Sequence, residues 1–335
     1  LNLTEQSQTF EFENLQSKPI LSLLRHFTSP VKLVYDYSLE ELSVLALHDA
    51  DHFNRWSAMQ RLFNRVISDL TEGSEASLTA CLTVTEKLLQ KTDMSLRVLA
   101  RCISLPSDTV ILDQFKVVDL DLILTAKKKL IAAIATHNKT AFYKLYTDHH
   151  STAEYSYDNK SVNQRIFKNT CLYYLAATND KTLLEMVGLQ YQAVNNMTDE
   201  FSILKALNNV DCKERETTFT KFYDQWQAEH LVVNKWLTLQ ALSTIEGAFE
   251  RVKDLTQHAA FNIKNPNKVY CLLLQFANYN LPGFHQKDGA GYDFIAEKIR
   301  GSKQVVNINV FNAYSNRISC RNVYLAGANL WIFSL

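Results

Sequence analysis

The chain has 335 residues, its 35 basic and 35 acidic side chains cancel, and 47% of its residues are hydrophobic. A net charge of zero argues against a nucleic acid or an anionic membrane surface as a partner, because both attract an excess of lysine and arginine. Since the sequence contains no long apolar run and no basic start followed by one, we expect neither a membrane-spanning helix nor a signal peptide.

The N-terminal segment has a different pattern from the sequence that follows it. QTFEFENL at 8–15 alternates apolar and polar side chains, and VKLVYDY at 31–37 is rich in β-branched and aromatic ones. Both patterns predict β-strands. Two or three strands cannot form a stable sheet alone, so we interpret residues 1–37 as the remnant of a β domain whose beginning is missing.

From Ser38 onward the spacing of apolar residues is helical. Ser38 and Glu41 form a capping box, which is typical of a helix start. An apolar stripe begins at Leu42 and continues through Phe53 to Leu70 at intervals of three and four residues. This pattern predicts an amphipathic helical region that packs one face against a core.

The rest of the chain predicts a mostly α fold. Amphipathic segments follow one another through short polar connections, which favours antiparallel helix pairs stacked in an array. Because no strict repeat is present, we expect residues 38–300 to form an irregular α-superhelix. From Gly301 to residue 335 there is no Asp or Glu and little periodicity, which predicts a divergent tail. The expected helical segments are 77–90, 94–104, 120–136, 139–148, 160–176, 181–193, 199–208, 213–229, 231–243, 246–257, 266–278 and 290–299.

Two histidines raise the question of a metal site. His48 and His52 stand four residues apart, with an aspartate after the first. On one helix face this is the ligand spacing of a zinc peptidase, with Glu72 as a third ligand. Two features argue against a zinc site. Asp49 is one methylene shorter than the glutamate that such a site requires, and Glu72 lies one residue away from the position of the third ligand. The alternative is a solvated helix face, and we expect this chain to bind no zinc.

The six cysteines are scattered and form no Cys-x-x-Cys motif. Most of them stand among apolar residues, so we interpret them as buried free thiols rather than disulfide partners. Free thiols are typical of a reducing compartment, which favours a cytoplasmic protein.

Three of the eight glycines fall in GFHQKDGAGY at 283–292. This stretch is open to interpretation as a phosphate loop, a metal loop or a turn. A phosphate-binding loop stands between a strand and a helix, and a helical array has no strand before this stretch. We therefore favour a turn between helices. We expect Asp288 to cap the next helix, Gly289 to turn the backbone tightly and Phe284 to pack inward.

Seven short fragments stand in a fixed order along the chain. They are FTSPVKL at 27–33, FNRW at 53–56, NNMTD at 195–199, YDQW at 223–226, LVVNKWLTLQA at 231–241, FNIKNPNK at 261–268 and FHQKDGAGY at 284–292. In this order and at these separations they resemble the C-terminal part of bacterial aminopeptidase N, the zinc alanyl aminopeptidases of the gluzincin class. The similarity runs from about residue 8 to about residue 299.

This resemblance implies the end of a β-sandwich domain followed by a helical domain that caps a catalytic chamber and controls substrate access. It also implies zinc as the cofactor of the full-length enzyme and peptides as its substrates. The family's His-Glu-x-x-His zinc motif and its Gly-Ala-Met-Glu-Asn motif lie upstream, and neither occurs in this sequence. We therefore expect no catalytic residue in this chain and no activity from it alone.

The resemblance also implies polar groups on the wall of the chamber. One is a basic residue two positions after Asn-Pro-Asn-Arg in the family, where this sequence has Asn-Pro-Asn-Lys and then Tyr270. The candidate wall residues are thus Asn265, Asn267, Lys268 and Tyr270. The family's later Asn-Pro-Gln-Val-Ala-Ser-Arg segment has no counterpart after Gly301.

The preferred hypothesis is a monomeric C-terminal fragment of a zinc metallo-aminopeptidase that removes N-terminal residues from peptides. The first alternative is a stand-alone α-solenoid that binds peptides or proteins without catalysis. The second is a metalloenzyme that uses His48 and His52. A His-Glu-x-x-His motif upstream of this chain would favour the first hypothesis over the solenoid.

Overall fold

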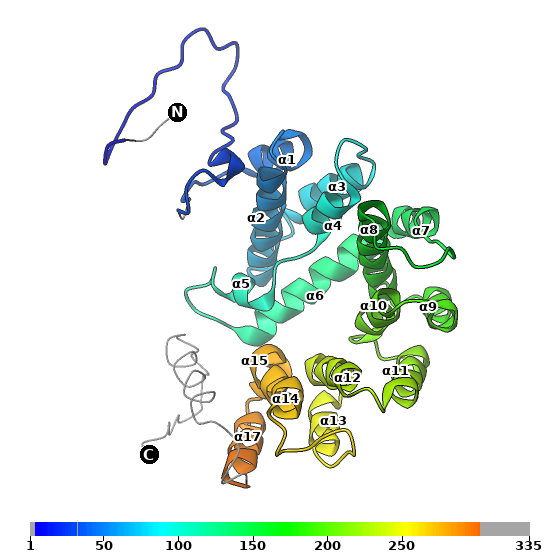
Figure 1. Ribbon diagram of the computed structural model, residues 1–335. Coiled ribbons are helices and arrows are strands. Elements are labelled where there is room, and N and C mark those ends of the chain that lie inside the picture. Colours follow the sequence, from blue (N-terminus) through cyan, green and yellow to red (C-terminus); the bar gives the residue numbers. More distant parts are fainter. Residues whose placement is uncertain (1–3, 32, 302–335) are drawn as a thin grey trace.

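The computed structural model describes residues 4–31 and 33–301. From Leu39 to Gly301 these residues form a succession of helices, and most helices pack against their neighbours in sequence. Figure 1 shows the helices following a curved path from α1 and α2, in blue, to α17, in orange. This arrangement confirms the predicted mostly α fold.

The helices of the first half run from α1 to α8, and α2 packs against α1, α4 and α6. Their bounds are α1 (Leu39–His48), α2 (His52–Thr71), α3 (Leu78–Leu89), α4 (Leu96–Ile103), α5 (Asp108–Leu112), α6 (Leu120–His137), α7 (Lys139–Asp148) and α8 (Asn159–Ala177).

The second half continues through α9 to α17 and includes the π-helical turn η2, which packs against α12. The bounds are α9 (Lys181–Ala193), α10 (Met197–Leu207), α11 (Lys213–Trp226), α12 (His230–Leu242), α13 (Ala248–Leu255), α14 (Pro266–Val269), η2 (Tyr270–Leu274), α15 (Gln275–Tyr279), α16 (Leu281–Phe284) and α17 (Ala290–Gly301).

Side-chain caps explain where several helices begin. The Ser38 hydroxyl accepts a hydrogen bond from the Glu41 N–H at 3.1 Å, and the Glu41 carboxylate accepts one from the Ser38 N–H at 2.9 Å. This confirms the predicted capping box at the start of α1. Asp158 and Asp180 cap α8 and α9 in the same way, through backbone N–H groups of the first turn.

The apolar stripes meet in one continuous core along the inside of the helix pairs. Phe142 of α7 stacks on Tyr174 of α8 with their ring centroids 4.7 Å apart. The Tyr174 hydroxyl donates to the Ile103 carbonyl oxygen at the end of α4. One buried side chain therefore joins three helices.

Asn280 makes a similar junction between α12 and α16. It is fully buried, and its amide donates to the carbonyl oxygens of Ala241 at 2.8 Å and Ser243 at 2.7 Å. Its own side-chain oxygen accepts from the Gly283 N–H at 3.1 Å. All the bonding positions of the side chain but one are thus used.

The array curls far enough for its two halves to touch. Helix α16 packs against α6, and the Lys287 ammonium lies 3.3 Å from the Asp121 carboxylate at the start of α6. Both side chains are largely exposed, so this ion pair adds little stability by itself. The contact is notable because it joins the beginning of α6 to a turn near the end of the described chain.

The predicted strands of the N-terminal segment are absent. Among residues 4–31 and 33–37 the structure contains no strand, and η1 (Arg25–Phe27) is the first helical turn. Figure 1 shows the beginning of this segment extended away from the helices at the α1 end, whereas η1 packs against α2. The correction has a simple cause: a strand needs a neighbouring strand to bond its backbone, and this chain offers none there.

The predicted turn at GFHQKDGAGY is confirmed. Asp288 accepts a hydrogen bond from the Ala290 N–H at 3.0 Å where α17 begins, and Phe284 is 2% exposed. Gly289 has φ +78°, a conformation that favours glycine. A Cβ on Gly291 would lie 2.2 Å from the Phe284 carbonyl oxygen, so only glycine allows this close approach.

Two further expectations can be compared with the described residues. Of the six cysteines, five lie in the described ranges and all five are free thiols, three of them buried. No helix there is long and apolar enough to cross a bilayer. The divergent tail predicted for 301–335 lies outside the described residues except for Gly301, so that expectation stays a prediction.

The turn also predicts a pH dependence of stability. Burial lowers the pKa of His285 from its ordinary 6.5 to about 4, and its Nδ1 lies 2.6 Å from the Tyr292 hydroxyl oxygen. His285 binds a proton more readily in the unfolded chain than in the folded one. The stabilisation that the neutral His285 imidazole gives to the fold is therefore present above pH 6.5 and is lost as the pH falls toward 4.

We expect His285→Gln to flatten the rise of unfolding free energy between pH 4.5 and pH 7 by about 2–3 kcal/mol. Urea unfolding at each pH measures this difference. His230→Gln, at an exposed histidine at the start of α12, serves as the matched control and should leave the slope unchanged. Equal slopes for His285→Gln and the unmodified chain would contradict the prediction.

Candidate functional site

The candidate wall residues lie at a helix start. The Asn265 side chain accepts a hydrogen bond from the Asn267 N–H at 3.0 Å, and Pro266 takes the first helical position of α14. Asn265 and Asn267 are both exposed. This combination of cap and proline sets the direction of the following helix, so the two asparagines position the residues after them.

Lys268 is the unusual member of this group. The residue as a whole is 6% exposed. Its ammonium is not among the fully buried polar atoms that lack a partner, so the end of the side chain reaches the surface. Burial lowers the pKa of Lys268, and the neighbouring Cys271 thiol acts weakly in the opposite direction. A mostly buried lysine whose ammonium reaches the surface is a candidate for contact with an anionic group, because a charge-assisted hydrogen bond is stronger than a neutral one.

Tyr270 follows on the exposed side of the same helical end. It is 42% exposed and begins the π-helical turn η2. Such turns are rare in proteins, and those that occur often lie at functional sites. The structure thus brings Lys268 and Tyr270 together at the α14–η2 junction, with one side chain directed inward and the other in contact with solvent.

The histidine pair does not form the predicted helix face. Helix α1 ends at His48 and α2 begins at His52, with Asp49 and Asp51 in the extended connection between them. The expected i, i+4 geometry is therefore wrong, because the helix breaks between the two histidines. Among the described residues no three or more His, Cys, Asp and Glu side chains gather where a metal ion could bind.

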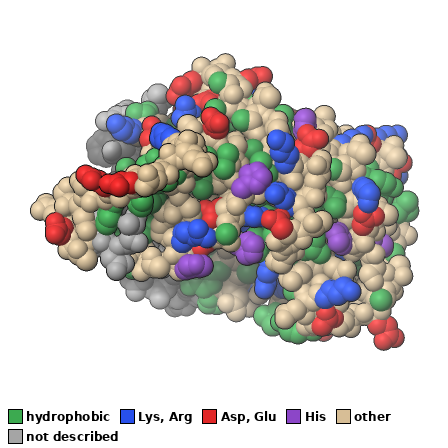
Figure 2. Space-filling model, turned by 90° about the horizontal axis from the view of Figure 1, so that it is seen from above, with side chains coloured by type: hydrophobic (Ala, Val, Ile, Leu, Met, Phe, Trp, Pro, Cys, Tyr) green, Lys and Arg blue, Asp and Glu red, His purple; other side chains and the backbone are tan. Residues whose placement is uncertain are grey.

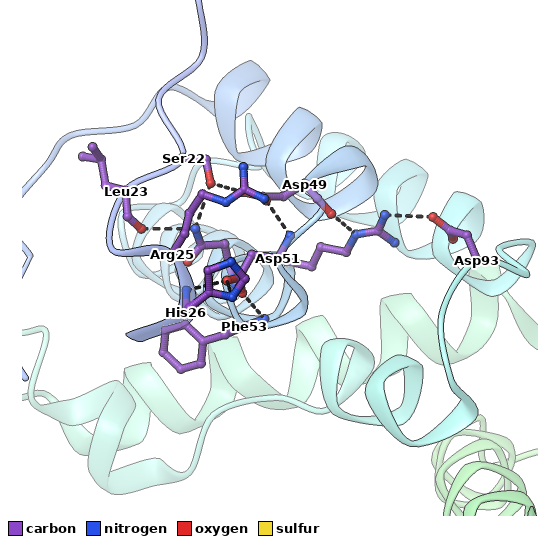
Figure 3. Close-up of polar contacts among 10 residues, drawn as sticks. Ser22, Leu23, Arg25, His26, Asp49, Asp51, Phe53 and Asp93 are labelled. Carbon is purple, nitrogen blue, oxygen red and sulfur yellow. Dashed lines mark hydrogen bonds and ion pairs between the residues drawn. The ribbon is translucent and has the colours of Figure 1, made fainter. Parts of the chain in front are cut away.

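The α1–α2 connection instead holds the end of the N-terminal segment (Figure 3). The Ser22 hydroxyl donates to the Asp49 carboxylate at 2.5 Å, and the His26 backbone N–H donates to the Asp51 carboxylate at 2.6 Å. The Arg25 guanidinium lies 3.9 Å from the Asp49 carboxylate. Two buried carboxylates thus anchor the chain as it enters the helical array.

Each of these carboxylates also organises its own turn. Asp49 and Asp51 are 7% and 6% exposed. Asp51 caps α2 by accepting from the N–H groups of Phe53 at 2.8 Å and Asn54 at 3.2 Å, while Asp49 accepts from the Asp51 N–H at 2.8 Å. The same two side chains therefore start α2 and bind the N-terminal segment.

Arg55 completes the junction from the other side. It is 5% exposed, and it donates to the Asp49 carbonyl oxygen at 2.5 Å and to the Asp93 carboxylate at 2.8 Å (Figure 3). Asn54 donates to the Ser22 hydroxyl at 2.9 Å. These contacts connect the N-terminal segment, the α1–α2 connection and the loop between α3 and α4.

The backbone at the junction is strained. Leu24 and His26 have φ of 51° and 56°, in the left-handed region that side chains other than glycine disfavour. Such residues persist where surrounding contacts hold them. The bonds to Asp49 and Asp51 provide those contacts.

A second polar cluster surrounds the NNMTD fragment. Asn196 caps α10 by accepting from the Asp199 N–H, and Asp199 forms an ion pair with Lys168 of α8 at 3.0 Å. The next residue, Glu200, is buried and accepts hydrogen bonds from the Trp226 indole and the Tyr191 hydroxyl. The fragments NNMTD and YDQW are therefore joined in space.

Sequence reasoning missed both polar clusters. The signal for the first was the pair of aspartates around Ala50, since Asp is a common helix cap. The second had no local signal, because Lys168 and Asp199 meet only when α8 and α10 pack. The charged surface is mixed: Figure 2 shows basic, acidic and histidine side chains interspersed on the face that it presents.

One comparison with known families agrees with the helical part of this architecture. Residues 39–312 match the family described as a domain of unknown function (DUF3458_C) with ARM repeats, and residues 1–36 match the domain of unknown function (DUF3458) with an Ig-like fold. The second match is to the segment that forms no strand in its described part.

Individual relatives match the same region. The chain is 33% identical to aminopeptidase N of Haemophilus influenzae over 302 residues and 31% identical to that of Escherichia coli over 306 residues. Each alignment covers 89% of this chain but only 34% and 35% of the two relatives. The chain thus spans about a third of the length of the curated relatives it matches.

A solved structure also matches. It is the crystal structure of Legionella pneumophila aminopeptidase A in complex with aspartic acid, with a TM-score of 0.78 and 32% sequence identity. The match covers 87% of this chain and 35% of that chain.

The junction yields a prediction about the N-terminal segment. Asp49→Ala removes the acceptor for Ser22 and Arg25, so the segment should open more often while the helices remain folded. We expect protease cleavage within residues 4–26 to accelerate about tenfold, as the loss of one or two such bonds implies. Glu72→Ala, at the exposed far end of α2, is the control and should leave the rate unchanged. A rate in Asp49→Ala equal to that control would refute the anchoring role.

Proposed function

The chain belongs to the DUF3458_C family of domains with ARM repeats, and we propose that it forms the C-terminal helical domain of an aminopeptidase. The observation that carries this proposal is the alignment of 89% of the chain with the C-terminal region of aminopeptidase N proteins at 31–33% identity. In the proposal the chain is a fragment of that enzyme, and its helical array caps the catalytic chamber and controls the access of peptides. Monomeric state and a cytoplasmic location remain predictions.

Zinc is the cofactor that the family resemblance implies for the whole enzyme. The described residues do not fit a zinc site, because no three potential ligands converge there. We therefore assign no catalytic step to them. In this proposal the chain contributes the wall of the chamber, and the reacting groups belong to the remainder of the full-length protein.

The wall is proposed to lie at the α14–η2 junction. Lys268 offers an ammonium at the end of a mostly buried side chain, and Tyr270 offers an exposed aromatic ring. A peptide carboxylate would supply the missing negative charge, and a charge-assisted bond of this kind is stronger than a neutral one. The exposed Asn265 and Asn267 complete the proposed wall, and Asn265 also caps α14.

The proposed activity can be tested by assaying two proteins. The complete gene product that contains residues 1–335 should hydrolyse an alanyl-nitroanilide, and the activity should disappear with a zinc chelator. The 335-residue chain alone should release no nitroaniline above background. Turnover by this chain alone would contradict the proposal, and an inactive complete gene product would favour the stand-alone peptide-binding solenoid.

The wall can be tested separately by Lys268→Met in the complete gene product. We expect the KM for a tetrapeptide to rise about tenfold, which corresponds to one lost charge-assisted bond. The kcat for alanyl-nitroanilide, which has no carboxylate, should stay the same. Lys264→Met, at the exposed lysine of the same turn, is the matched control. Equal KM values in both variants would remove Lys268 from the wall.

A further inference from the structure

The inner side of the curled array carries positive charge. Figure 1 shows α8, α10 and α12 along this inner side, with α7, α9 and α11 outside them. The Trp236 indole donates to the Phe219 carbonyl oxygen of α11 at 3.1 Å, which identifies the outward face of α12. Leu231 and Lys235 stand one turn apart on the face turned away from α11, and both are exposed. Lys235 therefore lies on the inner side.

Two lysines of this inner side share one aromatic ring. Lys205 follows Phe201 by one turn on α10, and its ammonium lies 4.9 Å from the centre of the Phe201 ring. The Lys235 ammonium reaches the same ring from α12, at 5.5 Å from its centre. A cation near an aromatic ring is attracted to its face, so the ring holds two positive charges close together.

No ion pair balances these two charges within the described residues. Helix α12 contains neither Asp nor Glu. The two acidic residues of α10 are engaged on its other faces, Asp199 with a lysine of α8 and Glu200 with the Trp226 indole. In this part of the chain neither Lys205 nor Lys235 forms an ion pair. The two lysines are therefore suited to an anionic ligand.

The two ammonium groups also repel each other. Burial lowers the pKa of Lys205, and the charge of Lys235 lowers it further. The Lys205 ammonium is thus partly shielded from water although the residue is exposed, and such shielding strengthens electrostatic interactions. An anionic group between the two lysines would relieve their repulsion and accept a charge-assisted hydrogen bond from each.

The positive strip continues from α12 to the proposed wall. Thr238 stands one turn after Lys235 on the same face of α12. Burial raises the pKa of Cys271, whereas Thr238 and Lys268 both act on this thiol to lower it, so the side chains of all three are neighbours. Residues 255–287 contain no Asp or Glu. The strip therefore runs over α10, α12 and α14 without an acidic side chain of its own to neutralise it.

The spacing of the strip favours a chain with several anionic groups over a single small anion. Packed helices lie about 8–10 Å apart, and an extended peptide advances about 3.3 Å per residue. Acidic side chains two or three residues apart in a peptide therefore match lysines on successive helices. We propose that the inner face of α10, α12 and α14 binds acidic peptides, with Asp or Glu side chains of the peptide on Lys205 and Lys235.

This inference deepens the proposed function and rests on it for the peptide nature of the ligand. It names a substrate class, peptides that carry Asp or Glu beyond the cleaved bond. The two ideas can fail separately, because binding by the 335-residue chain requires no catalysis. A chain that binds acidic peptide beside an inactive complete gene product would refute the proposed function alone. An active gene product whose 335-residue chain binds no acidic peptide would refute this inference alone.

The test is fluorescence anisotropy of the 335-residue chain with labelled, end-blocked heptapeptides. One peptide alternates Ala and Glu, and its matched control alternates Ala and Gln. We expect the Glu peptide to bind about tenfold more tightly, and the difference to shrink as salt rises from about 20 mM to about 300 mM, because salt screens exposed charges. Equal affinity for both peptides would overturn the proposal. A thymidine oligonucleotide of equal charge that binds as tightly would overturn it too, since the surface would then select charge alone.

Lysine variants locate the binding surface. Lys205→Gln and Lys235→Gln should each weaken binding of the Glu peptide about fivefold and leave binding of the Gln peptide unchanged, as expected for the loss of one charge-assisted bond. Lys221→Gln, at an exposed lysine of the outer helix α11, makes the same change of net charge and serves as the matched control. It should keep the affinity within about twofold, and equal weakening in all three variants would refute the assignment.

A conservative variant separates charge from structure. Lys235→Arg keeps the positive charge beside Phe201 and should retain the affinity of the unmodified chain within about twofold. The unfolding temperatures of all these surface variants should agree within about 2 °C. A loss of binding in Lys235→Arg as large as in Lys235→Gln would show that the charge of Lys235 does not carry the interaction, and would overturn the proposal.

Discussion

The last carbonyl groups of each helix need hydrogen-bond donors, and at three helix ends of this array a buried side chain from elsewhere in the chain supplies one. Asn280 donates to the end of α12, Tyr174 donates to the end of α4, and the fully buried Arg215 donates to the Asn208 carbonyl oxygen after α10. Apolar stripes bring the helices together, but they allow one helix to slide along another. These directed bonds connect particular helix ends, so they set how each pair is placed against the next.

The helices could be predicted because their signals are local. A stripe at intervals of three and four residues, and a cap such as Ser38 or Asp180, both lie within the helix that they define. Helices α5 and α16 escaped prediction because a helix of little more than one turn shows no stripe. The break at Asp49–Asp51 escaped because the apolar spacing continues across it. The prediction of N-terminal strands was wrong for the opposite reason. The local pattern suits a strand, but a strand forms only where a neighbouring strand bonds its backbone.

The sites were less accessible to sequence reasoning than the helices. The turn around Gly289 was predicted because its residues are consecutive and each has a distinct local role. The pairs Arg55–Asp93 and Lys168–Asp199 join residues that only tertiary packing brings together. Lys268 was proposed through a family resemblance, but its burial could not be foreseen, since lysine is almost always exposed. The resemblance identified the fragments, and the structure brings two of them together: Glu200, directly after NNMTD, accepts a hydrogen bond from Trp226 of YDQW.

The contact between α6 and α16 changes how the array should assemble. A helical array with contacts only between neighbours can nucleate anywhere and add one pair at a time. Here Lys287 meets Asp121, so the curled path is complete only when distant parts of the chain have met. Such a contact raises the mean sequence separation of interacting residues, which slows the formation of native structure. The curl therefore gives an open-ended architecture a late, long-range closing step and links the unfolding of its two halves.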